Sequence, residues 1–220
     1  MRAIVAEAVG SMLLVATVVG SGIMGDRLAN GNAAIALLAN SLATGGVLVT
    51  LIFTFAPISG AHFNPVVTLA AALEQTLPWR RVAGYVAAQI AGAVTGVIVA
   101  HAMFALPLIQ IGIRPRHGAA QFLSETVASF GLLVVVRGTG RRASVVPLTV
   151  GAYIAAAYWF TASTSFANPA VTIARAFTTT FSGIRPIDVP AFIGAQCLGA
   201  LLATGLFRWL LRPNPEKETV

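Results

Sequence analysis

Cysteine and charged residues are scarce in this chain of 220 residues. The single cysteine, Cys197, excludes a disulfide within the chain, and with three histidines there is no Cys/His cluster for a structural metal. Charged residues make up 10% of the sequence and hydrophobic residues 57%, above the roughly 45–50% apolar share of soluble domains. The composition indicates a chain that folds in lipid and needs no metal or other cofactor.

Acidic residues are also few, because seven Asp and Glu stand against 14 Lys and Arg, for a formal net charge of +7. Nucleic-acid binding would require these cations in one stripe or one basic helix, whereas here they are scattered between apolar runs. The sequence also lacks a nucleophile–base pair and a phosphate-binding loop. A nucleic-acid partner and an enzymatic function are therefore not expected.

Long apolar runs dominate the chain instead. A helix must have about 20 mostly apolar residues to cross the roughly 30 Å hydrocarbon core of a membrane. Two further apolar segments, of about ten residues each, are too short to cross. They begin at Asn64 and Asn168, each followed by proline, which is the pattern of an N-cap and a first helical position. We expect two half-helices that end inside the membrane, and six spans at about 3–24, 33–56, 82–106, 119–136, 143–162 and 190–211.

The distribution of basic residues predicts the orientation, because short loops rich in Lys and Arg stay in the cytoplasm. With both termini inside, the cytoplasmic side has nine basic residues and the other side five. We therefore expect cytoplasmic termini. The cytoplasmic set is Arg2, Arg80, Arg81, Arg137, Arg141, Arg142, Arg208, Arg212 and Lys217, and the opposite set is Arg27, Arg114, Arg116, Arg175 and Arg185.

The chain contains an internal repeat. A span with a glutamate, a half-helix that begins with Asn-Pro and a span with a glutamine occur in the same order in both halves. Each half has three spans, and this odd number requires the second half to insert upside down relative to the first. We expect one channel domain over 1–220, with repeats at about 1–110 and 117–212 and a tail at 213–220. The matching residues are Glu7 and Glu125, Asn64 and Asn168, and Gln89 and Gln196.

Inversion has a consequence for the half-helices. They must enter from opposite faces, so that their N-termini, each with a partial positive charge, meet near the midplane. Irregular backbone at this depth is tolerated only where it is buried in protein or lines a watery cavity. The sequence therefore predicts an all-α membrane protein of six transmembrane helices and two re-entrant half-helices around a pore.

The segment Ser59 to Thr68, SGAHFNPVVT, closely resembles the first signature of the major intrinsic proteins, the aquaporins and glycerol facilitators. The segment at 167–170, ANPA, resembles the second. The resemblance implies that each asparagine caps a half-helix and offers an amide donor to a passing solute. It also implies a homotetramer with one pore per subunit. The implied central motif of the pore is Asn64, Pro65, Val66, Asn168, Pro169 and Ala170.

Glu7 and Glu125 lie within spans, where an acid by default suggests a proton relay or a substrate site. In the family that the chain resembles, these glutamates accept hydrogen bonds from the backbone of the re-entrant loops. We therefore assign both to a scaffold, together with His62, Gln89 and Gln196.

The chain departs from the family pattern at the outer constriction. Most members have arginine three residues after the second asparagine, and here that residue is Val171. The resemblance places the other filter residues at Thr44, Ala156 and Ser165. No motif anchors Ala156, so Tyr158 or Trp159 could take its place. Four uncharged filter residues imply a wider constriction that excludes protons and cations less strongly.

Arg175 could substitute for the missing charge. It lies seven residues after Asn168, nearly on the same helix face but about 10 Å further toward the outer mouth. A place in the vestibule or between helices is therefore expected.

The filter resembles that of bacterial aquaporin-like channels permeable to arsenite, and this resemblance implies a bacterial plasma membrane as the location. We expect a passive channel for small uncharged solutes, such as arsenous acid or glycerol, together with water. The alternatives are a strict water channel and an ion-coupled secondary transporter, because inverted repeats with broken helices also occur in carriers.

Overall fold

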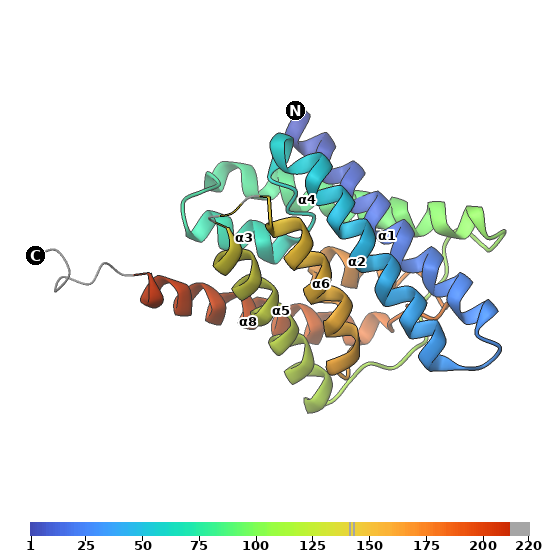
Figure 1. Cartoon of the computed structure of the whole chain (residues 1–220). Coiled ribbons are helices and arrows are strands. Elements are labelled where there is room, and N and C mark those ends of the chain that lie inside the picture. Colours follow the sequence, from blue (N-terminus) through green and yellow to red (C-terminus); the bar gives the residue numbers. More distant parts are fainter. Residues whose placement is uncertain (141, 143, 212–220) are drawn as a thin grey trace, which may run out of the picture.

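The computed structural model describes residues 1–140, 142 and 144–211. All regular secondary structure within these residues is helical, as the sequence predicts (Figure 1). The expected tail at 213–220 lies outside the described residues, as do Arg141, Arg212 and Lys217. The helices are α1 (Arg2–Leu28), α2 (Ala33–Ser59), α3 (Pro65–Leu73), α4 (Trp79–Met103), α5 (Ala119–Thr139), α6 (Val146–Phe160), α7 (Pro169–Arg175) and α8 (Val189–Leu210), with a 3-10 turn, η1 (Pro186–Asp188), before α8.

Five helices, α1, α2, α4, α5 and α8, are long and apolar enough to cross a membrane. The sixth expected span, at 143–162, is shorter: α6 has 15 residues, and position 143 lies outside the described residues. The helix ends because Thr161 adopts an extended backbone (φ −111°, ψ 134°), while its hydroxyl donates to the Ala157 carbonyl at 2.7 Å. A 15-residue helix is only about 22 Å long, which is shorter than the roughly 30 Å hydrocarbon core.

Two equivalent helix pairs form the frame, α1 with α4 in the first half and α5 with α8 in the second. Glycine allows the close approach at each crossing. A Cβ built at Gly92 would overlap the carbonyl oxygen of Ala8 on α1, and one at Gly199 would overlap the carbonyl oxygen of Thr126 on α5. The inverted repeat therefore extends to the way in which the helices pack.

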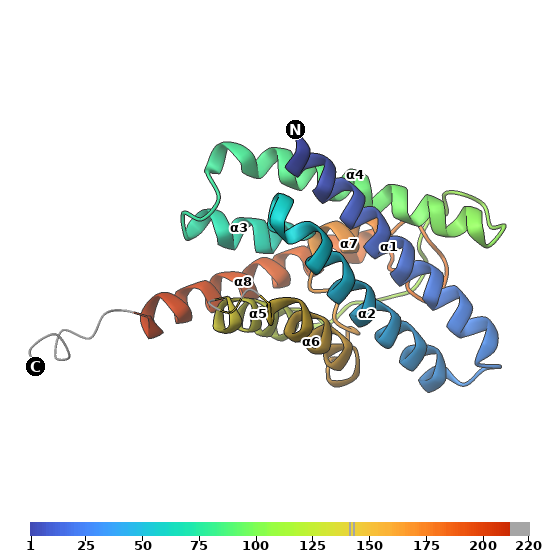
Figure 2. The same ribbon diagram turned by 45° about the horizontal axis from the view of Figure 1, so that its top comes forward.

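The two short helices lie inside this frame. Both α3 and α7 contact α4 and α8, and they contact each other. Figure 2 shows them between these two long helices. Each half-helix is therefore held by the final span of its own half and by that of the other half.

The outer surface of the bundle is apolar. Large hydrophobic side chains are exposed on several helices, among them Leu42 (62% exposed) and Phe53 (48%) on α2, Leu123 (63%) on α5 and Leu202 (52%) on α8. Such a surface is stable in lipid and would be unfavourable in water. The arrangement is that of an integral membrane protein.

Candidate functional site: a cavity between two half-helices

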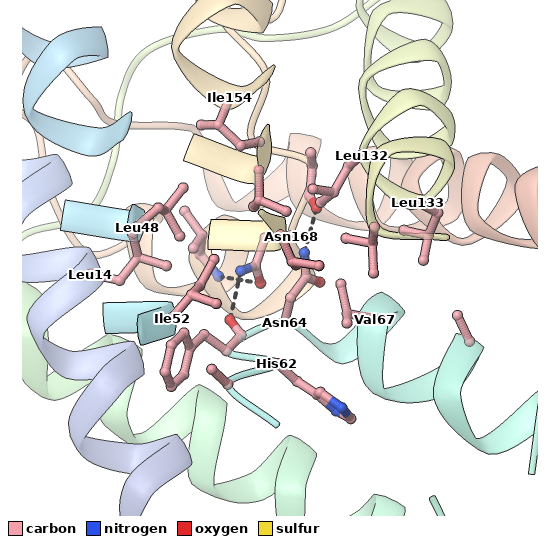
Figure 3. Close-up of a pocket in the computed structure, with 18 of the residues that line it drawn as sticks. Leu14, Leu48, Ile52, His62, Asn64, Val67, Leu132, Leu133, Ile154 and Asn168 are labelled. Carbon is pink, nitrogen blue, oxygen red and sulfur yellow. Dashed lines mark hydrogen bonds between the residues drawn. The ribbon is translucent and has the colours of Figure 1, made fainter. Parts of the chain in front are cut away.

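One cavity runs between the half-helices, with a volume of about 230 Å³. Since a water molecule takes about 30 Å³ in the liquid, this volume suits a short file of waters or a few small solutes. Apolar side chains such as Leu14, Leu48, Ile52 and Ile154 form much of the wall, and the two asparagines lie at its centre (Figure 3).

The two asparagines are the N-caps of the half-helices. The side-chain oxygen of Asn64 accepts from the Val66 amide at 3.1 Å, and that of Asn168 accepts from the Ala170 amide at 3.0 Å. The proline after each asparagine occupies the first helical turn, where no amide hydrogen is needed. Each cap leaves the side-chain nitrogen pointing away from its own helix.

These side-chain nitrogens join the two halves of the molecule. The Asn64 amide donates to the Ala167 carbonyl at 2.7 Å, and the Asn168 amide donates to the Phe63 carbonyl at 2.8 Å (Figure 3). A primary amide has two N–H donors, so one remains on each asparagine. Both side chains line the cavity, where the second donor can meet a solute.

The loops before the asparagines share an unusual backbone. Ala61 (φ 51°) and Phe63 (φ 48°) in the first loop match Ser165 (φ 47°) and Ala167 (φ 47°) in the second. Non-glycine residues rarely adopt this left-handed conformation, and those that do concentrate at functional sites. The alternation turns amides and carbonyls to different sides, so that the Phe63 amide faces Glu7 while its carbonyl accepts from Asn168.

Glu7 holds the first loop. Its buried carboxylate accepts from the backbone amides of His62 at 3.0 Å and Phe63 at 2.7 Å. Gln89 also donates to it at 2.7 Å, and the same nitrogen lies 2.9 Å from the Thr68 hydroxyl. The His62 ring is 3.1 Å from that hydroxyl, so the side chains predicted as scaffold on this side form one network.

Glu125 holds the second loop in the same way. Its carboxylate accepts from the amides of Phe166 and Ala167, both at 2.9 Å, and from Gln196 at 2.6 Å. The Gln196 nitrogen also donates to the Thr172 hydroxyl at 2.8 Å. Both glutamates are therefore fully buried and occupied by donors of the protein itself.

Three of the four predicted filter residues line the cavity: Thr44, Ser165 and Val171. The Thr44 hydroxyl lies 3.3 Å from the hydroxyl of Tyr158, which lines the cavity too. The sequence left Tyr158 open only as an alternative to Ala156.

The prediction of Ala156 is wrong. Its side chain is exposed on α6 and lies outside the described residues that line the cavity. The lining residues of α6 are Val146, Val150, Ile154 and Tyr158, four residues apart and thus on one face. Ala156 is two residues from Ile154, about 200° around the helix. The spacing of four places Tyr158 on this face, but only the structure shows that this face of α6 meets the cavity.

Arg175, at the end of α7, is more central than the sequence suggested. Its side chain is 2% exposed and lines the same cavity as Val171. The guanidinium carbon lies 3.3 Å from the centroid of the Phe166 ring, and Nε donates to the Ser182 carbonyl.

A second guanidinium, that of Arg116, approaches the same ring from the loop between α4 and α5, at 4.8 Å. It donates to the carbonyls of Ser163 and Gly183, each at 2.9 Å. Burial lowers the pKa of Arg116 to about 10, and the charge of Arg114 adds to the effect. Arg116 remains protonated at neutral pH, and it ties its loop to the one that carries Ser165. No motif in the sequence had predicted a structural role for this loop arginine.

The opposite part of the cavity wall has an ion pair between Glu74, at the end of α3, and Arg137 on α5. The Arg208 guanidinium donates to the neighbouring Leu73 carbonyl. These contacts fix the end of α3 against the second half of the chain.

Comparisons with known proteins agree with this architecture. The family model described as "Major intrinsic protein" matches residues 1–166 and 122–219. The chain is 56% identical over 213 residues to the aquaglyceroporin AqpS of Rhizobium meliloti (strain 1021), covering 96% of this chain and 91% of that protein. It is 27% identical to the aquaporin NIP6-1 of Arabidopsis thaliana, covering 98% and 71%. The X-ray structure of the aquaglyceroporin from Plasmodium falciparum has the same fold, with a TM-score of 0.75 at 19% identity over 96% of this chain and 97% of that one.

Proposed function

Because the chain belongs to the major intrinsic protein family of membrane channels, we propose that it conducts small uncharged solutes passively, with glycerol-like polyols and arsenous acid ahead of water alone. The relative AqpS is named an aquaglyceroporin, which supports a polyol-permeable pore. Arsenous acid is included because it is a compact neutral molecule with three hydroxyl groups and is similar in size to glycerol.

The observation that carries the proposal is the residue three positions after the second asparagine. Val171 lines the cavity with a short, uncharged side chain, beside the Ser165 hydroxyl and the Thr44–Tyr158 pair. A β-branched apolar residue occupies less of the bore than an arginine would, and it adds no charge of its own. The constriction therefore favours solutes that are wider than water and neutral.

The occupied glutamates support a channel over an ion-coupled transporter. A coupling acid must bind and release its ion or proton during transport. Glu7 and Glu125 each accept two backbone amides and one glutamine amide, which hold the loops that carry the asparagines. Losing the charge of either would disturb the pore that it supports.

Stopped-flow light scattering on proteoliposomes tests the proposal. The wild type should re-swell rapidly in glycerol and in neutral arsenous acid after osmotic shrinkage. Val171→Arg should slow solute entry by at least about tenfold, a barrier of roughly 1.4 kcal/mol, while water flow falls less. Val171→Leu is the matched control, because it adds bulk without charge. Fast water flow without solute entry in the wild type would instead identify a strict water pore.

We further propose a homotetramer with one pore per subunit, cytoplasmic N- and C-termini, and one channel domain built of two inverted repeats. Membership of the major intrinsic protein family supports the tetramer and the inverted repeats. The larger number of basic residues on the side of the two termini supports their cytoplasmic location. Light scattering after size-exclusion chromatography measures the subunit number, and protease access to a C-terminal epitope in inside-out vesicles measures the orientation.

A further inference from the structure

The guanidinium of Arg175 has donors that the protein itself does not use. The side chain is 2% exposed and lines the cavity. Its Nε donates to the Ser182 carbonyl, whereas its Nη1 is buried and has no hydrogen-bond partner among the described residues. A buried charged donor without a partner is costly, and a native structure retains one chiefly where a ligand or a function requires it.

The position of Arg175 lets its charge act near Val171. The two residues are four apart, one helical turn, and thus on the same face of α7. Side chains of a helix lean toward its N-terminus, so a long side chain at 175 extends back over the turn of Val171. The short Val171 side chain leaves room there. The Phe166 ring packs against the guanidinium, whose carbon lies 3.3 Å from the ring centroid. This contact holds the cation in place and leaves the N–H groups at the edge of the guanidinium free to donate.

Ser165 provides a second unused group on the same wall. Its hydroxyl is buried, lines the cavity and has no partner within the part of the chain that the structure describes. Much of the remaining lining is apolar, including Leu48, Ile52 and Ile154. A polar strip along an otherwise apolar bore matches a small polyol, whose hydroxyl groups and C–H backbone need different surroundings.

We propose that Arg175 is the filter arginine of this channel. Its guanidinium enters the constriction from one helical turn beyond Val171, and with the Ser165 hydroxyl it binds the hydroxyl groups of small neutral polyols. The inference rests on the proposed channel function and extends it. It also changes the expectation for ions: Arg175 lines the bore and Arg116 lies on the same Phe166 ring, so the constriction keeps a positive potential that repels protons and metal cations.

The test compares proton leak, water flow and glycerol entry in proteoliposomes for the wild type, Arg175→Gln and the double variant Val171→Arg/Arg175→Gln. Glutamine keeps an amide that can donate to the Ser182 carbonyl but removes the charge. Arg175→Gln should raise proton leak, read by an entrapped pH-sensitive dye, by about tenfold relative to water flow. The double variant returns a charge one turn earlier and should restore proton exclusion. Arg27→Gln, at an exposed arginine of α1, should match the wild type.

A folded Arg175→Gln channel with wild-type proton leak and an unchanged ratio of glycerol to water permeability would overturn the proposal. Arg175→Lys gives an independent test should the glutamine variant fail to fold. It keeps the charge but loses the planar fork, so proton exclusion should persist while glycerol entry falls several-fold relative to water. An unchanged ratio in the lysine variant would also overturn the proposal. Proton leak and water flow are measured without polyol, so they test Arg175 even if the wild type conducts no glycerol.

Discussion

At the scale of single residues, the pore depends on buried polar groups whose partners are fixed. Glu7 and Glu125 hold two irregular loops by their backbone amides, and the loops present Asn64 and Asn168 to the cavity. The charges of these two glutamates within the membrane therefore serve to hold the loops. A solute in the cavity meets amides, hydroxyls and apolar side chains, together with the Arg175 guanidinium and the Glu74–Arg137 ion pair on the opposite part of the wall.

Neutralising either glutamate should therefore affect folding more than flux. In Glu7→Gln or Glu125→Gln a neutral amide replaces a carboxylate that accepts from four donors at Glu7 and from three at Glu125, and the new NH₂ group faces some of these donors. We expect a loss of about 2–4 kcal/mol of stability, with permeability per folded channel within about twofold of the wild type. Thermal unfolding in detergent and stopped-flow flux measure the two effects, and Asp26→Asn on an exposed acid is the control. A folded, stable variant without transport would point to a coupling role.

Mercury should inhibit the channel only weakly. Cys197 lies on α8, half-buried, and is not among the described residues that line the cavity. Val171→Cys, which places a thiol in the bore, should make water flow sensitive to mercuric chloride and serves as the positive control. Strong, reversible block of the wild type that disappears in Cys197→Ser would contradict the position of this cysteine.

Residues tied to a repeated motif could be predicted from the sequence, and the others could not. Glu7, Asn64 and Gln89 each have a counterpart in the second half, so the repeat located them. Ala156 had no such anchor and was assigned to the wrong face of its helix. Helical rise alone does not predict where the Arg175 side chain lies, because its position also depends on the direction of the side chain and on the Phe166 ring.

At the scale of helices, close crossings at glycine bring the frame together. The pairs α1–α4 and α5–α8 repeat one geometry, in which a glycine meets a carbonyl of the facing helix. Hydropathy located the long spans within a few residues. It could not show that α6 ends at Phe160, because that end depends on the backbone of Thr161 and not on polarity.

Two glycines on α8 make this packing testable. Gly199→Ala would force a methyl group into the Thr126 carbonyl and should destabilise the channel by about 1–3 kcal/mol. No described atom lies within 4 Å of a Cβ built at Gly194, so Gly194→Ala should be neutral or slightly stabilising. Thermal unfolding in detergent compares the variants. Equal melting temperatures would show that the α5–α8 contact is looser than described.

At the scale of the whole molecule, the two inverted halves meet in one pair of reciprocal bonds. Asn64 reaches the loop of the second half, and Asn168 reaches the loop of the first. The inversion was predictable from three spans per half. The bonds across the centre were not, because they join atoms more than 100 positions apart in the chain. Among the described acids near this contact, Glu7 and Glu125 are held by donors of the protein, and Glu74 in the cavity wall is paired with Arg137, an arrangement that suits passive flow.

The most direct test of passive conduction is the final distribution of radiolabelled glycerol across proteoliposome membranes under imposed proton and sodium gradients. Passive conduction predicts rapid glycerol entry that stops at equal concentrations inside and outside, whichever gradient is applied. Empty vesicles should show no entry beyond the lipid background. Accumulation above the external concentration under either gradient would contradict passive conduction and identify a coupled transporter.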